Sequence, residues 1–106
     1  MLGFSESDAK KIRLWASTKA EIVDVHVFGS RAKGTYREDS DIDIAVRTNV
    51  EEELKFGFET DVHSDWQSEL QQLLQYTVQL EFAEPELDER VWPAVAEHGV
   101  KVYPGA

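Results

Sequence analysis

Apolar and polar residues alternate along this chain with two different periods, one typical of helices and one typical of strands. Near the N-terminus an apolar stripe recurs at helical spacing, and Ser5 followed by Asp8 fits a helix cap. We therefore predict a helix over about residues 5–19. Its stripe consists of Ile12, Trp15 and Ala16.

Three later segments alternate apolar and polar residues with the period of a strand. The first, EIVDVHVF, ends at Phe28 and is expected to turn Val23, Val25 and Val27 to one face. The second is DIDIAV at 41–46, and the third is TVQLEF at 77–82. A further extended segment is expected at 100–103.

Two more helices are predicted in the second half of the chain. Leucines and Trp66 form an apolar stripe that predicts a helix over about 61–75, while the region around Gly57 fits no element clearly. EPELDER then predicts a turn, and VWPAVAEH a short helix interrupted or kinked by Pro93 and stopped at Gly99. The resulting order predicts an α+β (mixed α/β) fold, with a small mixed sheet flanked by helices.

Length and composition favour one cytoplasmic domain spanning residues 1–106. The chain has no cysteine, which excludes disulfides and thiolate metal sites. Its N-terminus lacks the basic start and apolar core of a secretory signal, and no apolar run reaches the length of a membrane span.

The net charge of −10, from 21 acidic and 11 basic side chains, changes the expected ligand. An evenly acidic surface repels a phosphate backbone, so nucleic acid is not expected as the main ligand. Acidic groups attract divalent cations, which accompany nucleoside triphosphates. The charge therefore favours metal chemistry with a small anion.

Asp41 and Asp43 are the first candidates for that chemistry. Residues two apart on a strand share a face, with Cα atoms about 6.5 Å apart, so their carboxylates can converge. Carboxylates of this kind hold a pair of Mg²⁺ ions in enzymes that act at phosphorus. The alternative is a solvent-facing strand whose acidic residues only prevent aggregation.

Glu81 offers a third carboxylate from a neighbouring strand. It is a candidate to bind the metal next to the attacking hydroxyl, or to take the proton of that hydroxyl. Gln79 lies on the same face of that strand as Glu81. The alternative is that Glu81 is an ordinary exposed strand residue without a role in metal binding.

A Gly-Ser pair precedes the two aspartates. Gly29 allows close approach of a ligand, and Ser30 offers a hydroxyl where a helix begins, so the pair is suited to binding phosphate. Arg31 and Lys33 would add positive charge beside a triphosphate, although both fit solvated loop charges as well. The three histidines lack ligand spacing and are predicted to be structural or at the surface.

The segment GSRAKGTYREDSDIDIAV closely resembles the Gly-Ser, spacer, Asp-x-Asp signature of the DNA polymerase beta-like nucleotidyltransferase superfamily. The resemblance is to its minimal nucleotidyltransferase (MNT) branch, and VWPAVAEHGVKVY is similar to the C-terminal segment of that branch. It implies the nucleotidyltransferase fold and the transfer of AMP from ATP to a hydroxyl.

The resemblance also implies roles for individual residues. Gly29 and Ser30 would hold the β- and γ-phosphates, while Asp41 and Asp43 would bind two magnesium ions. Glu81 in LEF matches the third carboxylate of the family. If Gln79 in VQL holds that position instead, the domain is expected to bind nucleotide without turning it over.

The resemblance further implies a HEPN-type toxin as partner, with this chain as an antitoxin that adenylylates a tyrosine on it. A chain of this size is expected to lack a separate acceptor domain, so the acceptor is expected on a partner or on a second copy in a homo-oligomer. One alternative is a weak or inactive nucleotide-binding module that neutralises its partner by binding. Another is a transferase for a small molecule such as an aminoglycoside.

Overall fold

A computed structural model describes residues 2–85 and 88–105. Helices and strands follow one another in a mixed order that confirms the predicted α+β class. They are α1 (Glu6–Ser17), β1 (Ile22–Phe28), α2 (Ser30–Lys33), β2 (Ile42–Thr48), α3 (Glu52–Leu73), β3 (Val78–Phe82), α4 (Val91–His98) and β4 (Val100–Tyr103).

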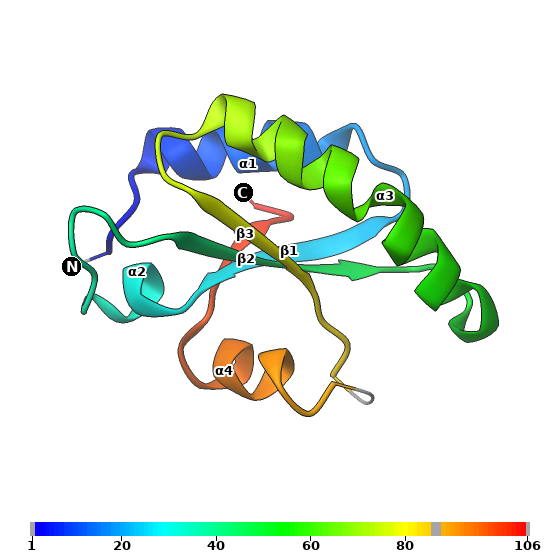
Figure 1. Ribbon diagram of the computed structural model, residues 1–106. Helices are drawn as coiled ribbons and strands as arrows, with labels where there is room; N and C mark the ends of the chain where they lie inside the picture. Colours follow the sequence, from blue (N-terminus) through cyan, green and yellow to red (C-terminus); the bar gives the residue numbers. More distant parts are fainter. Residues whose placement is uncertain (1, 86–87, 106) are drawn as a thin grey trace.

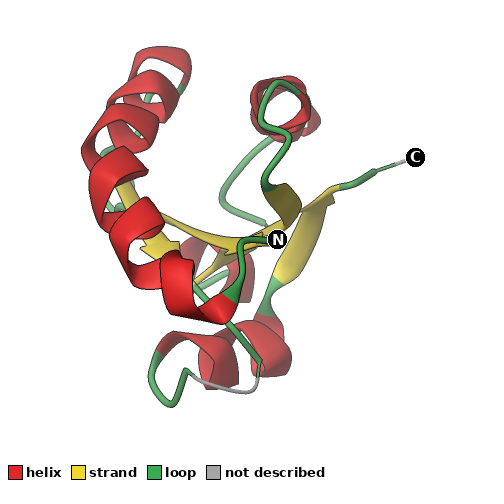
Figure 2. Cartoon of the chain, turned by 90° about the vertical axis from the view of Figure 1, so that its right-hand side faces the viewer, coloured by secondary structure: helices red, strands yellow, loops and turns green. Residues whose placement is uncertain are grey.

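The four strands form one mixed sheet in the order β3-β2-β1-β4. β1 pairs antiparallel with both β2 and β4, whereas β2 and β3 run parallel. Helices α1 and α3 cover one face of the sheet, and the short α4 lies on the other face (Figures 1 and 2). The second face is therefore only partly covered.

The main core lies between the sheet and the pair α1 and α3. Ile42, Ile44 and Val46 of β2 are all 0% exposed on this side, as the alternation in the sequence predicts. Trp66 and Leu70 of α3 pack into the same cluster. Helix α1 begins at the predicted cap: Ser5 and Asp8 each accept a hydrogen bond of 3.0 Å from the backbone N–H of the other.

Helix α3 begins about nine residues earlier than predicted and passes through Gly57 without a break. Its fully buried residues, Trp66 and Leu70, lie in the second half, whereas Phe58 and Val62 of the first half pack against the core only partly buried. In the first half Phe56 is 83% exposed. This half has good helix formers but no buried stripe, so the hydrophobic pattern gave no sign of it.

Two local predictions were wrong. Pro93 is the third residue of α4 and does not interrupt it, because the first turn of a helix needs no N–H at that position. Val23 does not point into the core with Val25: it lies at a bulge where β1 has one more residue than β2, and it is 37% exposed. The bulge instead buries Asp24. Residues 86 and 87 of the predicted turn lie outside the described residues.

Candidate functional site

The candidate site lies on the α4 side of the sheet, where β1 ends and β2 begins. The antiparallel register pairs Phe28 with Asp43, so the Gly29–Ser30 turn emerges directly beside that aspartate. Asp41 comes just before β2, and α2 starts at Ser30. The two parts of the Gly-Ser, Asp-x-Asp motif, separated by a loop in the sequence, are thus brought together by one strand pair.

Gly29 makes this close approach possible. Its φ angle of 75° is in the region that favours glycine, and a Cβ atom there would overlap the Asp43 carboxylate. The position therefore accepts only glycine, for two independent steric reasons.

Hydrogen bonds fix both polar groups of Gly29. Its carbonyl accepts the N–H groups of Ala32 and Lys33 at 3.1 and 3.0 Å, which forms the first turn of α2. Its own N–H donates to Nε2 of His98 at 2.9 Å. No local pattern connects His98 with this turn, because 69 positions separate the two residues.

The three predicted carboxylates share this side of the sheet. Asp41 is exposed, whereas Asp43 and Glu81 are partly buried. Burial raises the pKa of Asp43, and the charges of Asp41 and Glu81 raise it further. Negative charge is thus concentrated around a partly desolvated carboxylate. A divalent cation bound there would reduce the repulsion between these charges.

The strand register bears on the choice between Gln79 and Glu81. Gln79 is paired with Asp43, whereas Glu81 is paired with Ala45, two residues farther along each strand. The Gln79 amide donates to Asp41 at 3.4 Å, while Arg90 donates to Glu81 at 3.4 Å. Gln79 therefore lies level with the aspartates, but Glu81 still acts on Asp43 through its charge.

Within residues 2–85 and 88–105, no three Asp, Glu, His or Cys side chains are gathered closely enough to hold a metal ion by themselves. Asp41, Asp43 and Glu81 share one side of the sheet but do not form a complete ligand set in this structure. Magnesium usually keeps several water molecules and binds substrate phosphates, so a pair of carboxylates fits its needs.

Arg31 has a different environment from the predicted one. It is 3% exposed, and its guanidinium donates to the carbonyls of Gly3, Ser40 and Glu38 at 2.8, 3.0 and 3.1 Å. It also lies 4.0 Å from the ring centroid of Tyr76. In this structure Arg31 joins the N-terminus to the loop before β2, and its donors are not directed at a phosphate position.

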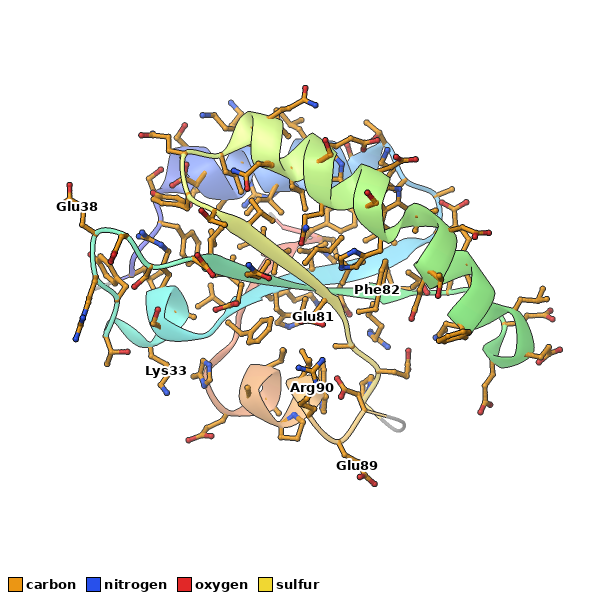
Figure 3. The ribbon with its side chains drawn as sticks, in the orientation of Figure 1. Lys33, Glu38, Glu81, Phe82, Glu89 and Arg90 are labelled. Atoms are coloured by element: carbon orange, nitrogen blue, oxygen red, sulfur yellow. The ribbon has the colours of Figure 1, made fainter. Side chains whose placement is uncertain are left out.

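Lys33, by contrast, is exposed at the end of α2 (Figure 3). Its side chain leaves α2 on the side of the sheet that carries α4 and Glu81. Of the two predicted basic residues, Lys33 is the one with a free approach to a ligand.

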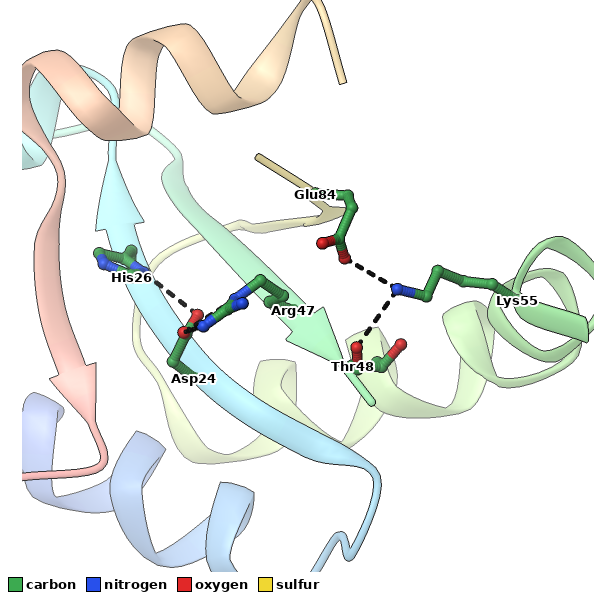
Figure 4. Close-up of polar contacts among 6 residues, drawn as sticks. All are labelled: Asp24, His26, Arg47, Thr48, Lys55 and Glu84. Carbon is green, nitrogen blue, oxygen red and sulfur yellow. Dashed lines mark hydrogen bonds and ion pairs between the residues drawn. The ribbon is translucent and has the colours of Figure 1, made fainter. Parts of the chain in front are cut away.

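A second polar group lies on the same side of the sheet, near the other end of β2 (Figure 4). Arg47 pairs with the buried Asp24, and Lys55 pairs with Glu84 at 2.8 Å. Lys55 also donates to the carbonyl of Thr48 at 3.3 Å. Each of these two cations is paired with its own carboxylate, so neither one neutralises the carboxylates around Asp43.

The family assignment follows from a sequence comparison that includes the site. The profile of the nucleotidyltransferase domain family matches residues 9–101, which include the Gly-Ser turn, both aspartates and Glu81. The chain belongs to the nucleotidyltransferase domain family. No curated protein sequence matches it significantly.

Solved structures share the fold of this nucleotidyltransferase domain. A toxin–antitoxin complex with AMP-PNP contains a chain with a TM-score of 0.64 and 21% identity, covering 90% of this chain and 72% of that one. A mutant of the MntA–HpeT toxin–antitoxin pair gives 0.62 and 20%, covering 91% and 72%. A protein from Sulfolobus solfataricus described as a nucleotidyltransferase gives 0.53 and 20%, covering 95% and 90%. At these identities the likeness shows the fold.

The described part of the chain has no helix both long enough and apolar enough to cross a membrane.

Proposed function

We propose that this chain is a magnesium-dependent adenylyltransferase that moves AMP from ATP to a hydroxyl group. The observation that carries the proposal is the contact between Gly29 and Asp43. It brings a helix start, where N–H groups lack partners within the helix, against a carboxylate whose pKa is raised by burial and by Asp41 and Glu81. Anionic phosphate and a divalent cation are the ligands that such a pair suits.

In this proposal Gly29 and Ser30 form a phosphate cradle for the β- and γ-phosphates, with Lys33 at its edge. Asp41 and Asp43 are the residues that would hold two magnesium ions, with Glu81 beside them. The metal would offset charge on the phosphates. Arg31 shapes the cradle from behind, through the carbonyls that it binds.

The proposed transfer has three steps. The acceptor oxygen forms a bond with the α-phosphorus, the bond to the bridging oxygen breaks, and pyrophosphate leaves. Glu81 takes the hydroxyl proton. A cytoplasmic location belongs to the proposal, because ATP is the substrate.

We further propose that the acceptor is a tyrosine on a HEPN-type toxin, which would make this chain an antitoxin. Two observations support it. The first is the motif at Gly29–Ser30 and Asp41–Asp43, and the second is the fold shared with chains of two toxin–antitoxin complexes, one of them with AMP-PNP.

The test uses ATP labelled on its α-phosphorus, magnesium and a HEPN-type toxin as the proposed acceptor. We expect label on the partner, and an at least ~1000-fold slower transfer by Asp43→Ala, equivalent to about 4 kcal/mol. Asp39→Ala is the matched control, because Asp39 is an exposed acid in the loop before β2. Absence of label with the wild-type chain would reject the enzyme.

A binding module without turnover is the second candidate, favoured by the position of Gln79 beside Asp43. It predicts that Asp43→Ala still neutralises the toxin in co-expressing cells. The enzyme hypothesis predicts that growth is lost with Asp43→Ala and retained with Asp39→Ala.

A further inference from the structure

We infer that His98 is a positioning residue for the phosphate cradle: its imidazole holds the Gly29–Ser30 turn in the conformation that faces Asp43. The inference rests on the proposed function, because it assigns His98 to the nucleotide site. His98 does not need to touch the substrate. It acts through the backbone of Gly29, to which its Nε2 atom is hydrogen-bonded at 2.9 Å.

Gly29 is the point at which the turn most needs an outside support. Glycine has the largest conformational freedom of any residue, and here it must hold a φ of 75° against the Asp43 carboxylate. The bonds from Ala32 and Lys33 hold its carbonyl but not the peptide group that precedes it. The bond to His98 fixes that remaining peptide group.

His98 is itself held firmly, because α4 is anchored at its start and packs on the sheet along its length. At the start, the Asp88 carboxylate accepts the N–H groups of Arg90, Val91 and Trp92 at 2.8, 2.9 and 2.8 Å. Along the helix, Val91 and Val95 pack on the buried Ala45 of β2. The imidazole is therefore presented from a helix fixed on the same strand that carries Asp43.

The direction of the hydrogen bond defines which substitutions can replace His98. Because Nε2 accepts, the ring proton is on Nδ1. A glutamine places its side-chain oxygen at about the distance of Nε2 from the backbone, whereas an asparagine reaches only about as far as Nδ1. His98→Gln should therefore keep the acceptor, and His98→Asn and His98→Leu should lose it.

Two measurements on the full chain test the inference. Calorimetry gives the dissociation constant (Kd) of magnesium–ATP, and NMR gives the exchange rate of the Gly29 amide hydrogen. We expect His98→Leu and His98→Asn to raise Kd about tenfold, which one lost hydrogen bond allows, and to speed the exchange of Gly29 at least ~10-fold. His98→Gln should restore both values to within about threefold of the wild type.

His63→Leu is the matched control. It also removes a partly buried imidazole that is hydrogen-bonded to the backbone, in this case to the carbonyl of Leu80 at 2.7 Å. It should leave the Gly29 exchange rate and the Kd of magnesium–ATP unchanged. If His98→Leu does not fold, the two amide variants still test the inference, because His98→Gln keeps the acceptor and His98→Asn loses it.

Different results would overturn different statements. Unchanged Gly29 exchange in both His98→Leu and His98→Asn would show that the contact is absent. Faster exchange with an unchanged Kd would show that the contact has no role in the cradle, and both results overturn the inference alone. No binding of magnesium–ATP by the wild-type chain would overturn the proposed function, and with it the nucleotide role of His98.

Discussion

The two faces of β2 contain residues from the same short stretch but have opposite surroundings. On one face Ile42, Ile44 and Val46 are fully enclosed by α1 and α3. On the other, Asp43 is partly buried beside Asp41 and Glu81, and its pKa is raised by burial and by their charges. The apolar face therefore stabilises a strand whose opposite face holds charge at a cost in free energy.

The largest effect is expected on the apolar face. Ile44→Ala should lower the free energy of unfolding by about 3–4 kcal/mol, since the removed atoms leave a cavity in a core position that is 0% exposed. Urea unfolding followed by circular dichroism measures the loss. Val23→Ala, at the exposed bulge of β1, is the control and should cost less than about 1 kcal/mol. Equal losses for the two variants would contradict the placement of Ile44 in the core and of Val23 at the surface.

A smaller effect is expected at the helix that covers part of the charged face. Asp88→Ala should cost about 1–2 kcal/mol, because three N–H groups at the start of α4 lose their acceptor. Burial raises the pKa of Asp88, but the hydrogen bonds from Val91, Arg90 and Trp92 outweigh it, and the net pKa is lowered.

The pH dependence of that loss provides its check. A lowered pKa means that the ionised carboxylate stabilises the folded chain above the ordinary value of 3.8, and that this stabilisation disappears as the pH falls through the lowered pKa. The difference between wild type and Asp88→Ala should therefore shrink in acid. Glu89→Ala, at the exposed neighbouring position, should cost less than about 0.5 kcal/mol at any pH.

The smallest effect has the opposite sign. Asp43→Asn should raise the melting temperature (Tm) by about 2 °C in metal-free buffer at pH 7, because it removes a repelled and partly desolvated charge. Solvent screening keeps the gain small. The same variant should lose transfer activity, so stability and function would change in opposite directions.

For Asp43 the sign of the pH effect is reversed. A raised pKa means that the folded chain is favoured below the ordinary value of 3.8 and loses this advantage as the pH rises through the raised pKa. The Tm gap between Asp43→Asn and wild type should thus open with rising pH and close in acid. Asp39→Asn is the control. An equal rise in Tm for Asp39→Asn would show that the effect comes from net charge alone.

Local features of the sequence were sufficient for most of the fold. The period of apolar residues located β2 and β3, and Ser5 with Asp8 marked the start of α1, because these signals depend on near neighbours. The first half of α3 escaped detection, since it packs little and so has no stripe. The bulge at Val23 was equally hidden, because it depends on the partner strand.

The motif of a glycine and a serine followed by two aspartates two residues apart is visible in the sequence alone. How the parts of that motif meet depends on the packing of the whole chain. It placed the Asp43 carboxylate against Gly29, buried Arg31 among carbonyls, put Gln79 level with Asp43 and brought His98 to the Gly29 amide. The cause of this difference is distance along the chain. Local spacing sets which side of a regular strand a residue takes, whereas the bulge at Val23 and contacts between residues up to 69 positions apart depend on how the whole sheet and its helices pack.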